Sequence, residues 1–194
     1  MPLGAFKAAL MGTAGVSTAD VVLLATATAD DTATISFTSD ITSTYGEYIF
    51  GFYNVDGGET RLTFQTSTDS GSNYDTTVTS TWFYSRLQEN HGGATLSYYT
   101  ANDQAQGTAF QLLNVNLKDD ADAGLSGKLH LFNPASTTYV KHFMARTEIL
   151  QSGDSTFDAF VAGYFNTTSA IDAIQFKMLS GNMSAGKIKM WGVK

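Results

Sequence analysis

The sequence predicts an all-β protein in which two antiparallel sheets stack as a sandwich with jelly-roll-like connections. Apolar and polar residues alternate through most of the chain, which is the pattern of strands with one buried face. Turns rich in Gly, Asn, Asp and Ser separate these segments at regular spacing. No amphipathic helix of ordinary length interrupts them, apart from a short candidate at residues 5–11. An immunoglobulin-like sandwich is the second choice, because such sandwiches usually have fewer strands.

Length and composition favour a single sandwich domain. The chain has 194 residues and no cysteine, and a domain of this size buries enough surface to fold without disulfides. We expect an extended N-terminal arm at residues 1–19 and the β-sandwich at residues 20–194. A weak signal peptide is the alternative for the start, although Gly and Thr break its apolar run. Phe6 and Lys7 of the arm are candidate interface residues.

The expected strands follow one another along the whole sandwich. Residues 20–29 and 32–39 are predicted to form a hairpin around Asp30 and Asp31. The segment EYIFGFYNV, residues 47–55, is apolar at nearly every position, as expected of a central strand covered on both faces. The other expected strands are residues 59–68, 79–87, 94–100, 107–117, 127–134, 137–150, 156–166, 170–179 and 186–193. This makes about eleven or twelve strands, of which the last two are predicted to form a closing hairpin.

One turn resembles a motif from glycan-cleaving enzymes. The segment STDSGSNY, residues 67–74, is similar to the Asp-box of sialidase propellers, Ser-x-Asp-x-Gly-x-Thr-Trp. Asn73 and Tyr74 replace the Thr and Trp of the motif, and the chain has a single copy. In sialidases this box is a turn remote from the catalytic site. The segment therefore predicts a turn between two strands and gives no support for hydrolysis.

The same turn contains weak calcium candidates, Asp69, Asn73 and Asp75, because oxygen ligands recur there at short intervals. The segment lacks the distal bidentate Glu that would make a calcium loop convincing. The acidic loop KDDADAG, residues 118–124, is a second weak metal candidate, although such loops are usually only solvated. We therefore predict no metal ion.

Catalysis is not expected. The histidines His91, His130 and His142 lie in separate segments and do not predict a zinc site. No Gly-x-Ser-x-Gly elbow and no phosphate-binding glycine loop is present, and nothing pairs two carboxylates for glycoside hydrolysis. We predict no cofactor. The net charge of −7 argues against nucleic-acid binding, and no stretch is long and apolar enough for membrane insertion as a helix.

The expected closing hairpin carries a set of basic residues. Lys177, Lys187 and Lys189 alternate with apolar residues and should share one charged face. Protection of an exposed strand edge by lysine is the simpler interpretation, and a complementary contact between neighbouring subunits is the functional one. Trp191 in the same segment is a further interface candidate. The many aromatic residues either fill the core or are exposed to stack on sugars and anchor interfaces.

The C-terminal part of the chain resembles a family of tailed-phage virion proteins. The shared features are an Ile-x-x-Ile-x-Phe strand at residues 171–176, a Ser-Gly-Asn turn at residues 180–182 and a final Lys-Ile-Lys-x-x-Gly-x-Lys strand at residues 187–194. The segment STDSGSNYD resembles the middle of the same proteins. The resemblance covers residues 45–194 and concerns turns and core strands, so it assigns no catalytic residue.

This resemblance implies jelly-roll proteins that decorate the phage head or form head or tail fibres, commonly as trimers. We therefore expect a structural virion protein, assembled in the host bacterial cytoplasm, that decorates or cements the capsid as a homo-oligomer. Its expected partners are the major capsid protein or tail proteins. The alternative is a tail-fibre or receptor-binding module that recognises a host surface glycan through exposed aromatic, Asn, Asp or Gln side chains.

Overall fold

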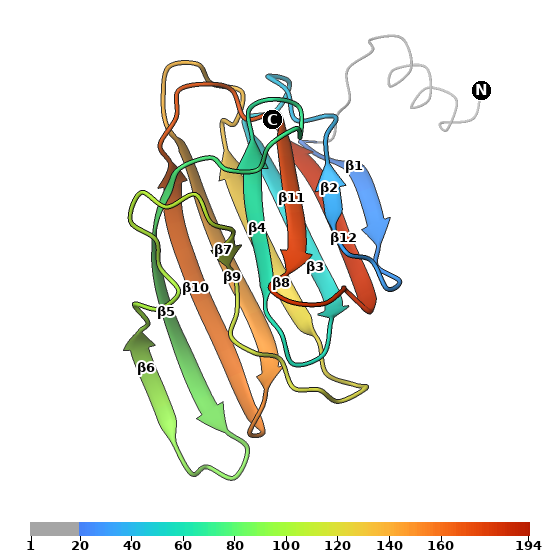
Figure 1. The fold of residues 1–194 in the computed structure, drawn as a ribbon, viewed down its shortest axis with the longest axis vertical. Coiled ribbons are helices and arrows are strands. Elements are labelled where there is room, and N and C mark those ends of the chain that lie inside the picture. Colours follow the sequence, from blue (N-terminus) through green and yellow to red (C-terminus); the bar gives the residue numbers. More distant parts are fainter. Residues whose placement is uncertain (1–19) are drawn as a thin grey trace, which may run out of the picture.

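The computed structural model describes residues 20–194, which form an eight-stranded and a four-stranded antiparallel sheet (Figure 1). No helix occurs in this range. The predicted all-β, jelly-roll-like sandwich is therefore confirmed. The expected arm at residues 1–19 lies outside the described residues, and with it the short helix candidate at 5–11 and the interface candidates Phe6 and Lys7.

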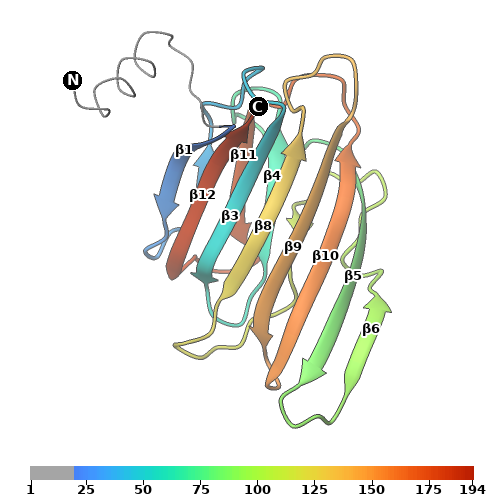
Figure 2. The same cartoon turned by 180° about the vertical axis from the view of Figure 1, so that it is seen from behind.

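The eight-stranded sheet, called here the large sheet, has the order β1-β12-β3-β8-β9-β10-β5-β6, and the small sheet has the order β2-β11-β4-β7. Figure 1 shows the small sheet in front of the large one, and Figure 2 shows the large sheet from its other side. The bounds are β1 Val21–Thr28, β2 Ile35–Phe37, β3 Glu47–Asp56, β4 Leu62–Ser67, β5 Val78–Gln88, β6 Ala94–Tyr98, β7 Gln111–Leu112, β8 Leu125–Phe132, β9 Lys141–Gln151, β10 Ser155–Phe165, β11 Ala173–Met178 and β12 Ala185–Val193.

The core lies between the two sheets and is rich in phenylalanine. Successive side chains of a strand point to opposite faces, so that each strand contributes every second residue to the core. Phe64 of β4 lies at the centre, with its ring centroid 5.2 Å from that of Phe143 on β9 and 6.0 Å from that of Phe165 on β10. Phe176 of β11 packs against Phe50 and other rings of the large sheet. Burial of each such side chain stabilises the fold by roughly 1.5–3 kcal/mol.

Both predicted hairpins are wrong. The segment around Asp30 and Asp31 leads from β1, which pairs with β12 in the large sheet, to β2, which pairs with β11 in the small sheet. Likewise, the turn after β11 leads to β12 in the other sheet. Thr32 and Met183 form an isolated bridge between these two crossings. Alternation of apolar and polar residues shows which side of a strand faces the core, but it does not show which strand is its partner. Two consecutive strands have the same alternation whether they pair with each other or lie in facing sheets.

Two single strands also differ from expectation. β3 is central in the large sheet, but Tyr53 and Asn54 near its end are exposed, so the strand is not covered on both faces throughout. The expected strand at residues 107–117 contains only β7, Gln111–Leu112. Gln111 and Asn114 in this segment are buried and use their side chains to hydrogen-bond backbone groups, which replaces a regular ladder.

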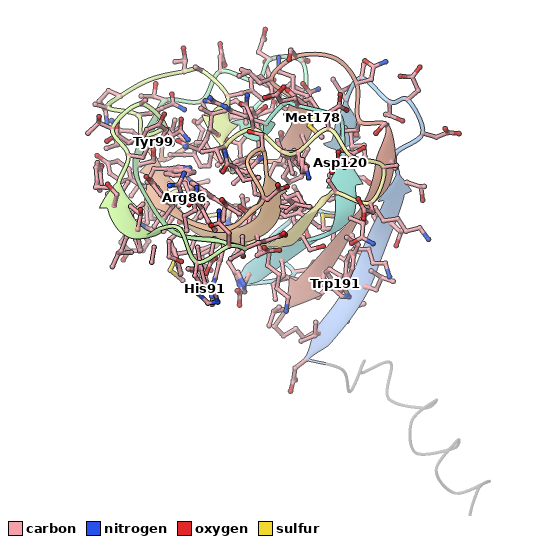
Figure 3. All side chains as sticks on the ribbon, turned by 90° about the horizontal axis from the view of Figure 1, so that it is seen from below. Arg86, His91, Tyr99, Asp120, Met178 and Trp191 are labelled. Carbon is pink, nitrogen blue, oxygen red and sulfur yellow. The ribbon has the colours of Figure 1, made fainter. Side chains whose placement is uncertain are left out.

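The large sheet is wider than the small one and curves around it (Figures 1 and 3). Its β5–β6 end extends past β7, the edge of the small sheet. The large sheet therefore has two surfaces that the small sheet does not cover. One is its outer face, the side turned away from the small sheet. The other is the inner side of its β5–β6 end.

Candidate functional site

The outer face of the large sheet carries exposed apolar side chains along its width. Strand register places most of the exposed large hydrophobic residues of the described chain on this side, namely Val21, Leu23, Tyr53, Phe83, Leu87, Leu96, Tyr98 and Met144. Leu96 is 75% exposed and Met144 is 53% exposed. Contiguous apolar surface on a soluble protein usually marks an interaction site.

A stacked aromatic pair lies near the middle of the outer face. The rings of Phe83 and Phe160 are parallel within 3°, with centroids 4.8 Å apart. The Arg146 guanidinium lies 4.9 Å from the centroid of the Phe160 ring, and its Nη2 donates to Oδ2 of Asp158 over 2.7 Å. This hydrogen bond and the carboxylate charge raise the pKa of Arg146. An open hollow of about 580 Å³ lies beside the pair and reaches Met144 on β9.

The interface candidates on β12 also belong to the outer face. Trp191 is half-buried, with its ring centroid 6.3 Å from that of Tyr53 on β3. Lys189 places its Nζ 5.1 Å from the centroid of the Tyr53 ring, and Lys187 is exposed. Figure 3 labels Trp191 on the side of the sheet away from the small sheet. The structure thus brings three predicted interface residues onto one surface.

Lys177 does not share that surface. It lies on β11 in the small sheet, where its Nζ is 4.0 Å from the centroid of the Phe110 ring. β11 lies between β2 and β4, and β12 lies between β1 and β3, so none of the three lysines is on an edge strand. The prediction of one common lysine face is therefore wrong, and so is edge protection.

The Asp-box-like segment forms a turn that connects β4 of the small sheet to β5 of the large sheet. A turn between two strands was predicted there. The carboxylate of Asp69 accepts hydrogen bonds from Ser67 Oγ at 2.6 Å and from Asn73 N and Nδ2 at 2.9 and 2.7 Å. The bond from Ser67 and then those from Asn73 lower the pKa of Asp69 to about 2. Both carboxylate oxygens thus have donors from the turn itself, and Asp75 adds no hydrogen bond to the cluster.

The other chemical candidates lie apart from one another. His130 contacts Glu47 on the outer face, His142 lies beside Tyr164, and His91 is in the β5–β6 turn. In the acidic loop, Asp120 forms an ion pair with Lys118. Among residues 20–194, no group of three or more His, Cys, Asp or Glu side chains is placed to hold a metal ion.

Another hollow, of about 600 Å³, lies at the end of the large sheet near His91. Its lining includes four acids, of which two have side-chain partners within the fold. Asp56 accepts from Gly58 N and Ser184 Oγ, and Glu148 accepts from Thr156 Oγ1. These contacts give Asp56 and Glu148 a structural role.

A smaller cleft lies on the inner side of the β5–β6 end, and we call it the inner cleft. It has a volume of about 280 Å³ and is lined chiefly by Arg61, Tyr84, Tyr99, Asn116, Gln151 and Phe157. Tyr84 stacks on buried Phe157 with centroids 4.4 Å apart. Tyr99, which is 37% exposed, stands at 89° to Tyr84 with centroids 6.1 Å apart.

Arg61 lines this cleft, and Arg86 lies next to it on the inner face of the large sheet. Arg61 donates from Nε to Asn116 Oδ1 over 2.7 Å. Arg86 follows Tyr84 on the same face of β5 and pairs in register with Phe157; Figure 3 labels it with Tyr99 on the inner side of the curved sheet. Neither arginine takes part in an ion pair within the described chain, whereas Arg146 does. Arg86 Nε is buried without a hydrogen-bond partner.

Sequence reasoning considered the aromatic residues only as a group and did not single out either arginine. One signal was available. In the segment TSTWFYSRL, the alternation that buries Trp82 also places Tyr84 and Arg86 on the same inner face. A charged residue at a position expected to face the core indicates either a structural ion pair or a binding site.

Comparisons with known proteins add no assignment, because no protein-family model and no curated protein matches the chain. Among residues 20–194, no helix is long and apolar enough to cross a membrane.

Proposed function

We propose that the protein is a structural component of a tailed-phage virion that decorates the capsid and associates with neighbouring copies through its outer face. The observation that carries this proposal is the exposed apolar surface spread over β1, β3, β5, β6 and β9. The sequence resemblance of residues 45–194 to phage virion proteins supports the particle as its location.

The composition of the outer face suits a contact between copies. Arg146 and the Phe83–Phe160 stack form a compact aromatic and arginine cluster, and such clusters commonly dominate binding energy. Lys187 and Lys189 lie towards the β1 end, whereas the carboxylate of Glu148 lies on β9. Charges of both signs on one face allow a ring of identical subunits to pair opposite charges, for example as a trimer. A stable contact should bury more than about 1,000 Å² in total.

The position and copy number of the protein in purified virions test this proposal. Decoration predicts label over the whole capsid and copies on the order of hundreds per particle, because shell proteins follow capsid symmetry. Quantitative mass spectrometry and labelled electron microscopy measure both. A capsid without label would contradict the proposed role.

The alternative function is a tail-fibre or receptor-binding module that recognises a host surface glycan. The inner cleft favours it, because the exposed ring of Tyr99 and the half-buried ring of Tyr84 lie beside Arg61 and Asn116, and such a combination is suited to sugar rings. The same count of copies separates the two functions, since about three to eighteen copies located at the tail would indicate this module.

A further inference from the structure

We propose that the inner cleft binds an acidic saccharide, with a sugar ring against Tyr99 and Tyr84 and an anionic group on Arg61. This inference gives the ligand class for the alternative function, and it does not depend on the capsid role. A decoration protein and a tail module could each carry such a site on the same fold.

The aromatic residues provide the surface for a sugar ring. Tyr84 is held in place by stacking on Phe157, which is buried, and by the edge of Trp82, whose centroid is 6.0 Å away. Tyr99 stands nearly perpendicular to Tyr84, and its ring is partly exposed. The two rings form a corner with apolar walls. Such walls attract the C–H faces of a pyranose, while its hydroxyl groups remain free to bind polar side chains.

Polar groups are placed around this corner. Asn116 and Gln151 line the cleft, and Arg61 fixes the side chain of Asn116. Behind Arg61, Asn102 is only 2% exposed and accepts a long hydrogen bond from its Nη1. The hydrogen bonds to Asn116 and Asn102 hold the Arg61 guanidinium at the cleft.

The charge of the cleft determines the class of saccharide. The whole chain has a net charge of −7, yet the residues that line the cleft include Arg61 and no Asp or Glu. Arg61 takes part in no ion pair within residues 20–194. A planar guanidinium binds a carboxylate or sulfate group through paired, charge-assisted hydrogen bonds. A uronic acid or a sulfated sugar supplies such a group next to a pyranose ring.

The size of the cleft limits the ligand. Its volume of about 280 Å³ is near the lower end of the range for small-molecule sites, roughly 300–1,000 Å³. It therefore accommodates one sugar residue, and the remainder of an oligosaccharide continues along the open surface. We expect weak binding of a single chain, which multiple copies on one particle would strengthen.

Calorimetric titration of the full chain tests the inference. The probes are hexagalacturonate for the carboxylate class, a heparin hexasaccharide for the sulfate class and cellohexaose as the neutral control. We expect at least one acidic probe to bind about tenfold more tightly than cellohexaose, because charge-assisted bonds to arginine are lost with the neutral sugar. The two acidic probes show which anionic group is preferred. Equal affinity for all three, or no binding of either acidic probe, would overturn the inference.

Two variants locate the binding. Tyr99→Ala removes the exposed ring, and Arg61→Gln removes the charge; each is expected to weaken binding of the acidic probe about tenfold. Tyr139→Ala is the matched control for the first, because Tyr139 is 73% exposed and is not among the cleft residues. Circular dichroism confirms that each variant is folded. If Arg61→Gln does not fold, Tyr99→Ala alone decides the outcome, and binding that survives this exposed substitution contradicts the assigned site.

The capsid experiment remains independent of this one. Copy number and labelling of virions address the proposed function without any saccharide, and the titration uses isolated protein without any capsid. Failure of one therefore does not imply failure of the other.

Discussion

The outer faces of the two sheets differ in whether the described chain covers them. On the small sheet, the outward side of β4 is covered by the chain itself, and Thr63, Gln65 and Ser67 are buried there. On the large sheet, large apolar side chains such as Leu96 and Met144 are exposed to solvent. The first face is covered by the described chain, whereas residues 20–194 leave the second face exposed.

The covering of the small sheet is polar. Gln65 donates from Nε2 to the carbonyl oxygens of Thr76, Thr108 and Ala109, each over 3.1 Å. Its Oε1 accepts from the backbone N of Thr66. The buried polar groups of this face are thus matched to a loop of the same chain, as buried groups must be. Among residues 20–194, no loop covers the apolar groups on the outer face of the large sheet in the same way.

The largest expected effect is on the small sheet. Gln65→Leu should lower the free energy of unfolding by about 3 kcal/mol, because it leaves the buried Thr76 carbonyl and the buried Thr66 N–H without this partner. Gln175, its partner in register on β11, is half-exposed and bonded only to Ser36 Oγ, so Gln175→Leu is the matched control. The control should change stability by less than about 0.5 kcal/mol. Urea denaturation measures the free energy of unfolding of both variants. Equal losses in the two variants would contradict the special role of the buried Gln65 contacts in covering the small sheet.

A substitution on the outer face of the large sheet should change self-association of the protein and not its free energy of unfolding. Leu96→Asp is expected to leave the unfolding free energy within about 0.5 kcal/mol of the parent, because the side chain is already exposed. It should weaken self-association at least tenfold, or about 1.4 kcal/mol, by placing a charge in the proposed contact. Leu179→Asp is the control, since Leu179 is 60% exposed but follows β11 of the small sheet. Sedimentation equilibrium that shows equal weakening by both variants would contradict the outer face as the interface.

The smallest expected effect concerns the turn that carries the chain from one sheet to the other. The pKa of Asp69 is lowered from 3.8 to about 2 by donors that exist only in the folded turn. The ionised carboxylate therefore adds stability above the unfolded pKa, and this contribution is lost as the pH falls through the folded pKa. Asp69→Asn should flatten the decrease in stability between about pH 4 and pH 2. Asp75→Asn, in the same turn, is the control, and an identical change in both variants would argue against this role.

Much of the fold follows from the local pattern of the sequence. In β9, buried and exposed residues alternate from Lys141 to Ile149, and the segment was predicted as a strand for that reason. The bounds of β5, β10 and β12 agree with the expected strands to within one residue at each end. Alternation is a property of neighbouring residues, so it can be seen without knowledge of the rest of the chain.

Strand partners and the candidate sites depend on distant residues and were not predictable in the same way. β1 pairs with β12, more than 150 residues away in the chain, and no local pattern encodes that choice. Phe83 and Tyr84 are adjacent aromatic residues on opposite faces of β5. Phe83 is on the outer face and is exposed there. The exposure of Tyr84 depends on where the small sheet ends, because that edge leaves the inner cleft uncovered. The sequence therefore indicated aromatic surfaces without indicating where they lie.

The central positions of β11 and β12 affect how the protein can be made. A ribosome delivers residues 173–193 after all other strands, yet these residues separate β2 from β4 and β1 from β3. Until they emerge, each sheet has a gap, and the earlier strands expose their edges in the nascent chain. A premature stop codon before residue 173 would thus divide both sheets and would not merely shorten an edge.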